Sequence, residues 1–153
     1  MARTAAPGTP GGAPAAAALQ SALSAENAAV YGYGLAGARL TGSQFTVAQE
    51  YWSGHRSARA TLTTMITQLG SAPPPAAAAY RPPFPVNSAG AAVSLAAMLE
   101  DGVLTAYLGL VAVDDPSMRA FGAQRMQTAA IRAAYWRGTT VPFPGLPASA
   151  LRG

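Results

Sequence analysis

The sequence predicts an all-α protein built as an antiparallel four-helix bundle, and three observations lead to this prediction. Apolar residues recur every three or four positions in four long stretches, which is the spacing of a packed helix face. Pro-rich or polar segments separate these stretches and make connections that are short, long and short along the chain. The length of 153 residues suits one domain with a single core.

The first helix is expected over 14–40, after a disordered N-terminal tail over 1–13 that is rich in Pro, Gly and Ala. One seam position near the middle of this helix is a carboxylate, Glu26. The seam consists of Leu19, Leu23, Glu26, Val30, Tyr33, Gly37 and Leu40. A neighbouring helix is expected to pass close to three glycines that lie within six positions. These glycines are Gly32, Gly34 and Gly37.

The second helix is expected over 44–69, and the short turn at 41–43 makes it an antiparallel neighbour of the first. Its seam consists of Phe45, Ala48, Trp52, His55, Arg59, Leu62, Ile66 and Leu69. The segment 71–87 contains six Pro and is predicted to be an extended crossover. About seventeen extended residues at roughly 3.1 Å each can run the whole length of a 25-residue helix.

The third helix is expected over 88–113, with Asn87 or Ser88 as its N-cap. Its seam consists of Val93, Ala96, Glu100, Val103, Tyr107 and Leu110. The fourth helix is expected to begin at the acidic cap and Pro116, and to end at Arg137 before Gly138. Its seam is less clean than the others: Met118, Phe121, Arg125, Thr128, Arg132 and Tyr135 make one row, and Met126, Ala129 and Trp136 lie on another.

These helices predict one bundle domain over 14–138, followed by a Pro-rich C-terminal tail over 139–153. Phe143 and Leu146 are expected to anchor that tail on one end of the bundle. The connectivity, with one long crossover between the second and third helices, is that of ferritin-like bundles.

A polar layer is expected at mid-height of the bundle, because Glu26, His55, Glu100 and Arg125 each lie near the middle of a different helix. An unpaired buried carboxylate costs several kcal/mol, so each glutamate needs a partner. Arg side chains on the seams are one source of partners, through fork-to-carboxylate pairs. The expected polar core network consists of Glu26, His55, Glu100, Arg59, Arg125 and Arg132.

Two alternatives to a purely structural network follow from the same residues. Glu26, His55 and Glu100 supply three ligands that suit one iron, manganese or zinc ion, and such a site could be redox active. Aromatic side chains could instead line a pocket for a small ligand, although aromatics at helical spacing are usually core. The candidate pocket residues are Tyr33, Trp52, Tyr107 and Tyr135.

Composition excludes several classes of function. The absence of Cys excludes thiol catalysis and Cys-ligated metal centres. All ten basic residues are Arg, and they are scattered, so the net charge of +4 does not predict nucleic-acid binding. No stretch of eighteen apolar residues lacks breakers, and Pro and Gly near the N-terminus replace a signal-peptide core. We therefore expect no transmembrane segment and a cytoplasmic location. The sequence names no partner; homodimerisation through the glycine face or the Pro-Phe-Pro segments is possible.

Four phrases of the chain are similar to those of a family of small bacterial ferritin-like domains of unknown function. They are AALQSALSAENAAVYGYGLAGARL, HRSAR, AAYRPPFPV, and AAIRAAYWRG with the FPGL that follows it. The central carboxylates also resemble the ferritin-like superfamily of di-iron proteins, in which two helices each supply Glu and two others each supply Glu-x-x-His.

This resemblance implies a degenerate di-iron site. Glu26 and Glu100 match the single Glu of the first and third helices, and His55 matches the His of the second. Trp52 stands where the second helix should carry its Glu, and the fourth helix has no Glu-x-x-His, its nearest pattern beginning at Arg125. The loss of half of the ligands predicts a non-enzymatic protein without a di-iron centre.

Overall fold

Four α-helices and one short 3₁₀ helix make up the part of the chain that the computed structural model describes, residues 12–139, and no strand is found there. The elements are α1 (Gly12–Gly37), α2 (Gly42–Gln68), α3 (Ala89–Tyr107), η1 (Leu108–Ala112) and α4 (Pro116–Arg137). The all-α class and the four helices are confirmed. Most of the N-terminal tail predicted at 1–13, and nearly all of the C-terminal tail with Phe143 and Leu146, lie outside the described residues.

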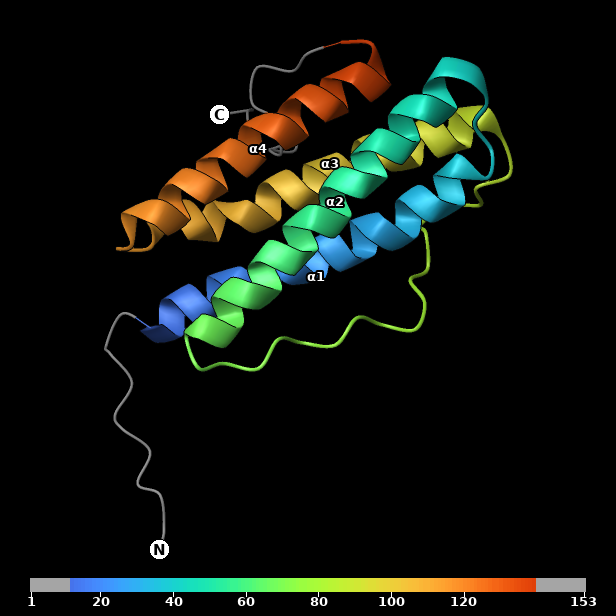
Figure 1. The fold of residues 1–153 in the computed structure, drawn as a ribbon. Helices are drawn as coiled ribbons and strands as arrows, with labels where there is room; N and C mark the ends of the chain where they lie inside the picture. The colour runs from blue at the N-terminus through green and yellow to red at the C-terminus, as the bar shows by residue number, and fades with distance from the viewer. Residues whose placement is uncertain (1–11, 140–153) are drawn as a thin grey trace, which may run out of the picture.

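The helices pack side by side, with α1 against both α2 and α3, and α3 against α4 (Figure 1). The long connection from α2 to α3 runs along the outside of α1. Gln20 Nε2 donates to Ala72 O (3.3 Å) near the start of this connection, and Arg39 Nε donates to Val86 O (3.2 Å) near its end. Because Gln20 lies in the first half of α1 and Arg39 just beyond its C-terminal end, these hydrogen bonds fix the path of the connection along the bundle.

Local signals explain where the helices begin and end. Ser88 Oγ accepts from Ala91 N (3.1 Å) at the start of α3. Asp115 Oδ1 accepts from the backbone N of Ser117 (2.8 Å) and of Met118 (2.9 Å) at the start of α4. Such caps satisfy backbone N–H groups that the helix itself leaves without partners. The end of α4 is also as predicted, since Gly138 adopts the left-handed conformation (φ 69°).

Three predicted boundaries were wrong by a few residues. Helix α1 already begins at Gly12, inside the predicted tail, and it ends at Gly37 although Leu40 is still buried. The third helix does not stay α-helical to residue 113 but tightens into η1 after Tyr107, a common ending for α-helices. Leu110 in η1 is nevertheless buried, so the predicted seam continues through this tighter turn.

The core consists of two apolar clusters, one on each side of the predicted polar layer. The first cluster consists of Leu19, Ala22, Leu23, Ala29, Leu62, Ile66, Val103, Leu104, Tyr107, Leu110 and Ala129. The second consists of Tyr33, Ala36, Leu40, Ala48, Ala92, Ala96, Ala97 and Trp136. Both clusters draw on all four helices, so the bundle has apolar packing towards both of its ends.

The predicted close approach at the glycines holds at one position of three. A Cβ added to Gly32 would lie 2.4 Å from Leu99 Cδ1, so the Leu99 side chain of α3 packs directly over this glycine. No atom lies within 4 Å of a Cβ at Gly34, and the nearest to Gly37 is Phe45 at 4.0 Å. The last two glycines therefore leave open space on α1 instead of a helix contact.

Of the two rows predicted for the fourth helix, the second, with Ala129 and Trp136, contributes to the buried face. The buried positions of α4 are Gly122, Ala129, Ala133 and Trp136. Small residues on this row let α4 approach its neighbours, and a Cβ at Gly122 would lie 2.8 Å from Leu110 Cβ. Tyr135, on the first predicted row, is 43% exposed. Phe45 and Leu69, the two ends of the predicted α2 seam, are also more than one third exposed.

One stretch among the described residues, Ala89–Ala112, is long and apolar enough to cross a membrane by length and composition alone. It comprises α3 and η1, packs against α1 and α4, and contains the fully buried Glu100. A core helix of a bundle meets the same two criteria, and the burial of this stretch is consistent with the expectation of no transmembrane segment.

Candidate functional site

Three helices contribute one fully buried ionisable side chain each to the middle of the bundle. Glu26 of α1, His55 of α2 and Glu100 of α3 all have no exposed surface. His55 Nδ1 lies 2.6 Å from Glu26 Oε2, and His55 Nε2 lies 3.0 Å from Glu100 Oε1. The imidazole ring therefore lies between two carboxylates and connects α1, α2 and α3.

This geometry corresponds to a doubly protonated imidazole. An ionised carboxylate can only accept, so a ring bonded to two of them donates from both nitrogens. Burial acts to lower the pKa of His55, but the hydrogen bonds and negative charges of Glu100 and Glu26 outweigh it and raise that pKa above 6.5. Burial acts to raise the pKa of Glu26, but His55, Arg125 and Tyr107 outweigh it and hold that pKa below 4.5.

Helix α4 supplies a second cation to Glu26. Arg125 Nη2 lies 3.0 Å from Glu26 Oε1, and the same oxygen accepts from the hydroxyl of Tyr107 at 2.8 Å. Burial disfavours the charged guanidinium, yet the neighbouring Glu26 charge keeps the pKa of Arg125 above its ordinary value. Glu26 thus accepts three hydrogen bonds, two of them from cations, which is the strong, charge-assisted kind.

Glu100 receives its second hydrogen bond from a tyrosine. The Tyr33 hydroxyl donates to Glu100 Oε1 at 2.6 Å, and it accepts in turn from Trp136 Nε1 at 2.8 Å. Burial and the Glu100 charge raise the pKa of Tyr33 well above its ordinary value, so its phenol stays protonated. Burial and the Glu26 charge do the same for Tyr107. Both tyrosines therefore act as donors.

The charges of this Glu26–His55–Glu100–Arg125 cluster, hereafter the polar layer, sum to zero. Two carboxylates face one imidazolium and one guanidinium, so no net charge is buried. Three buried polar atoms near or within the layer have no partner in the described part of the chain. They are Glu100 Oε2, Arg125 Nε and Arg132 Nη1.

Two arginines predicted to join this network do not pair with its carboxylates. The guanidinium carbon of Arg132 lies 4.5 Å above the ring of Tyr51, in a cation–π contact, and its Nη2 packs against Gly54. Arg59 forms no ion pair with any described residue and instead lines a cleft on the surface. Their long side chains leave the seam, because helical spacing fixes the position of a Cα but not the direction of a flexible side chain.

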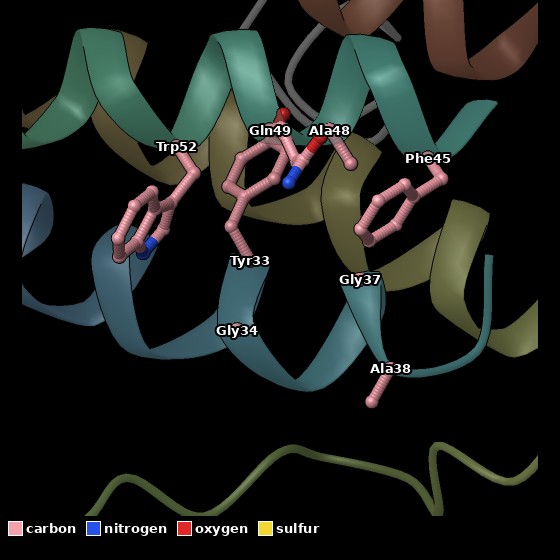
Figure 2. Close-up of a pocket in the computed structure, with 8 residues that line it drawn as sticks. All are labelled: Tyr33, Gly34, Gly37, Ala38, Phe45, Ala48, Gln49 and Trp52. Atoms are coloured by element: carbon pink, nitrogen blue, oxygen red, sulfur yellow. The ribbon is translucent and has the colours of Figure 1, made fainter. Parts of the chain in front are cut away.

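The four aromatics predicted to line a pocket do not gather in one place. Tyr33 and Trp52 line a hollow of about 310 Å³ between α1 and α2, beside Gly34 and Gly37 (Figure 2). Tyr107 is fully buried against Glu26, and Tyr135 lies at the surface, so neither lines this hollow. Trp52 is itself held by a hydrogen bond from Nε1 to Val30 O (3.1 Å).

Tyr33 and Tyr107 were predicted as pocket residues and not as members of the polar layer, although the sequence carries a signal for that role. Tyr33 follows Glu26 by seven positions, and Tyr107 follows Glu100 by seven. Each tyrosine bonds to the glutamate of the other helix, not to its own. A repeated Glu-x6-Tyr on two seam faces is thus the sequence signature of this reciprocal pair.

Comparison with known proteins places the chain in a family. The family model described as a domain of unknown function, DUF4439, matches residues 18–148. The chain belongs to this DUF4439 family. A conserved hypothetical protein of the same general shape, rv2844 from Mycobacterium tuberculosis, has a crystal structure that matches with a TM-score of 0.79 and 30% identity over 82% of this chain and 96% of that chain. No curated protein matches. The expectation of a family without known function is confirmed.

Removing the Glu26 carboxylate should strongly destabilise this DUF4439 protein. Glu26→Ala is expected to lower the free energy of unfolding by about 3–5 kcal/mol, because it leaves two buried cations without their anion. Glu26→Gln should lower the free energy of unfolding by less, since the amide oxygen of the glutamine can still accept from Tyr107 and Arg125. Urea denaturation measures both, with the exposed Glu50→Ala as control, expected within about 0.5 kcal/mol of wild type. Equal stability of wild type and Glu26→Ala would contradict the ion pairing.

Stability should also depend on pH in two directions. The Glu26 contribution is present above about pH 4.5 and is lost as the pH falls through its lowered folded pKa. The His55 contribution is complete below about pH 6.5 and is lost as the pH rises towards its raised folded pKa. Urea denaturation across a pH series should therefore show maximal stability between these values.

The expected decline in stability above about pH 6.5 can be assigned to one side chain, because the chain has a single His and neither Cys nor Lys. His55→Gln should abolish the decline in stability between about pH 6.5 and pH 9. A wild-type profile that stays flat over this interval would show that His55 is not held as a cation.

Proposed function

We propose that this protein is a ferritin-like, antiparallel four-helix bundle that is neither an enzyme nor a metalloprotein, and that it serves as a structural or partner-binding module. A polar layer of Glu26, His55, Glu100 and Arg125 stands where ferritin-like proteins hold two iron ions. The observation that carries the proposal is that both ring nitrogens of His55 lie within hydrogen-bond distance of carboxylates.

The path of the chain supports ferritin-like connectivity. The connection between α2 and α3 follows the length of α1, with contacts at Gln20, at Arg39 and between the Tyr31 and Tyr80 rings (centroids 5.5 Å apart). Such a connection returns the chain to the opposite end of the bundle before α3 begins (Figure 1). One long crossover of this kind distinguishes ferritin-like bundles from bundles with short loops only.

The residues of the layer do not fit a di-iron centre. Only three of the expected ligands are present, and the fourth helix contributes Arg125, a cation, where an acid and a histidine are needed. A metal-bound imidazole offers a nitrogen lone pair to the metal, whereas both nitrogens of His55 are within hydrogen-bond distance of carboxylates. Between residues 12 and 139, no group of three or more His, Cys, Asp or Glu is arranged to hold a metal ion.

The same geometry argues against catalysis by the layer. A general acid or base must reach the proton that it transfers, within hydrogen-bond distance or through one water. Glu26, His55 and Glu100 have no exposed surface. Both ring nitrogens of His55 already contact a carboxylate, so neither is available to a substrate. We infer that the layer holds the helices together, and that any partner binds elsewhere on the bundle, including the possible homodimer face.

One observation favours a second candidate function, a mononuclear site for iron, manganese or zinc. Glu100 Oε2 is buried and has no hydrogen-bond partner in the described part of the chain, so it could act as a ligand. Such a site needs His55 to lose at least one proton and to turn a nitrogen lone pair towards the metal. The polar layer would then have to separate at the Glu100–His55 contact.

Metal analysis separates the two candidates. Untagged protein, as purified and after incubation with iron(II), manganese(II) and zinc(II), is expected to contain no stoichiometric metal and to melt at an unchanged temperature. A stoichiometric metal that raises the melting temperature, and that is lost in Glu100→Gln but retained in the exposed Glu50→Gln, would overturn the proposal and support the mononuclear site.

A further inference from the structure

A second candidate site lies outside the polar layer, in a cleft of about 510 Å³ between α1, α2 and the start of their outer connection. Helix α1 supplies Leu23 and Asn27, α2 supplies Arg59 and Thr63, and the connection supplies the wall 73–76. The hydrogen bond from Gln20 to Ala72 anchors that wall immediately before the cleft. The cleft is thus a fixed feature of the fold and is independent of the function proposed above.

Arg59 brings an uncompensated positive charge to this cleft. Its guanidinium forms no hydrogen bond or ion pair with any residue between 12 and 139, although the side chain is partly buried. Elsewhere in the bundle, Arg125 pairs with Glu26 and Arg137 pairs with Asp101. Arg59 therefore has its full set of donors available to a ligand.

Asn27 gives the second, independent indication of a ligand. It is only 6% exposed, yet its carboxamide makes no hydrogen bond with the described residues, and it lines the same cleft. The amide atoms of Asn27 are not among the fully buried atoms that lack a partner, so they open into the cleft, where water or a ligand can bond to them. An amide N–H beside an unpaired guanidinium is a donor arrangement that suits an anion.

The opposite wall restricts which anion fits. Three consecutive prolines, 73–75, have no N–H and offer only apolar surface and carbonyl oxygens. Thr63 already donates its hydroxyl to Arg59 O at 2.9 Å. Side-chain donors in the cleft are therefore confined to Arg59 and Asn27, while the prolines provide an apolar surface next to them.

We propose that this cleft binds a small organic carboxylate with an apolar body. The carboxylate pairs with the planar fork of Arg59 and accepts from the Asn27 amide, and the apolar body packs on the prolines. A phosphate group usually takes more donors, often backbone N–H groups, and the proline wall cannot supply these.

Titration with matched probes tests the carboxylate chemistry. Benzoate and its neutral analogue benzamide, together with acetate and inorganic phosphate, are added separately to the full-length protein while amide signals are followed by NMR. We expect benzoate to shift the signals of Asn27, Arg59 and Thr63 and to bind about tenfold more tightly than benzamide. Acetate should bind more weakly than benzoate, because it lacks the apolar body.

Variants assign the binding to the cleft. Arg59→Gln and Asn27→Ala should each weaken benzoate binding by about tenfold or more. Arg56 stacks on Trp52 and does not line the cleft, so Arg56→Gln should leave binding unchanged. Melting curves confirm that the variants are folded. Equal binding of benzoate and benzamide, tighter binding of phosphate, shifts confined to other residues, or an unchanged affinity in Arg59→Gln would each overturn the proposal.

Discussion

The structure depends on one imidazolium held between two buried carboxylates. Without the positive charge on His55, Glu26 and Glu100 would carry two negative charges in the core against the single charge of Arg125. Burying that excess charge would cost several kcal/mol. With the positive charge on His55, the layer is neutral. Its hydrogen bonds reach every helix of the bundle, since α4 contributes Arg125 and also Trp136, which donates to Tyr33.

A second constraint is that α1 and α3 must approach closely for their side chains to cross. Tyr33 of α1 reaches Glu100 of α3, and Tyr107 of α3 reaches Glu26 of α1. Gly32 lies at this contact, and its missing side chain leaves room for Leu99. Sliding either helix by one turn would separate both pairs and leave the glutamates unsatisfied. The layer thus fixes helix register between two apolar clusters that alone would tolerate several registers.

Much of this fold was predictable because helix signals are local. The cap at Asp115, the left-handed Gly138 and the alternating spacing of apolar residues placed the helices to within a few positions. The same spacing put Glu26, His55 and Glu100 at matching heights, and the structure brings them into contact. The direction that a long side chain takes depends on the whole fold, and predictions that relied on it were wrong. Two arginines on the same seams as the layer turn elsewhere, and the buried row of α4 consists mainly of small residues that a hydrophobicity pattern does not reveal.

Membership of the DUF4439 family and the match to rv2844 give the chain relatives but no activity. The central claim therefore concerns chemistry that can be observed directly, the protonation of the single His. Nitrogen-15 NMR of protein labelled only at His gives one pair of ring signals, with no assignment needed. At about pH 7.5, one unit above the ordinary pKa of His, both ring nitrogens should appear protonated and coupled to slowly exchanging hydrogens. One protonated and one bare nitrogen at that pH would contradict the account.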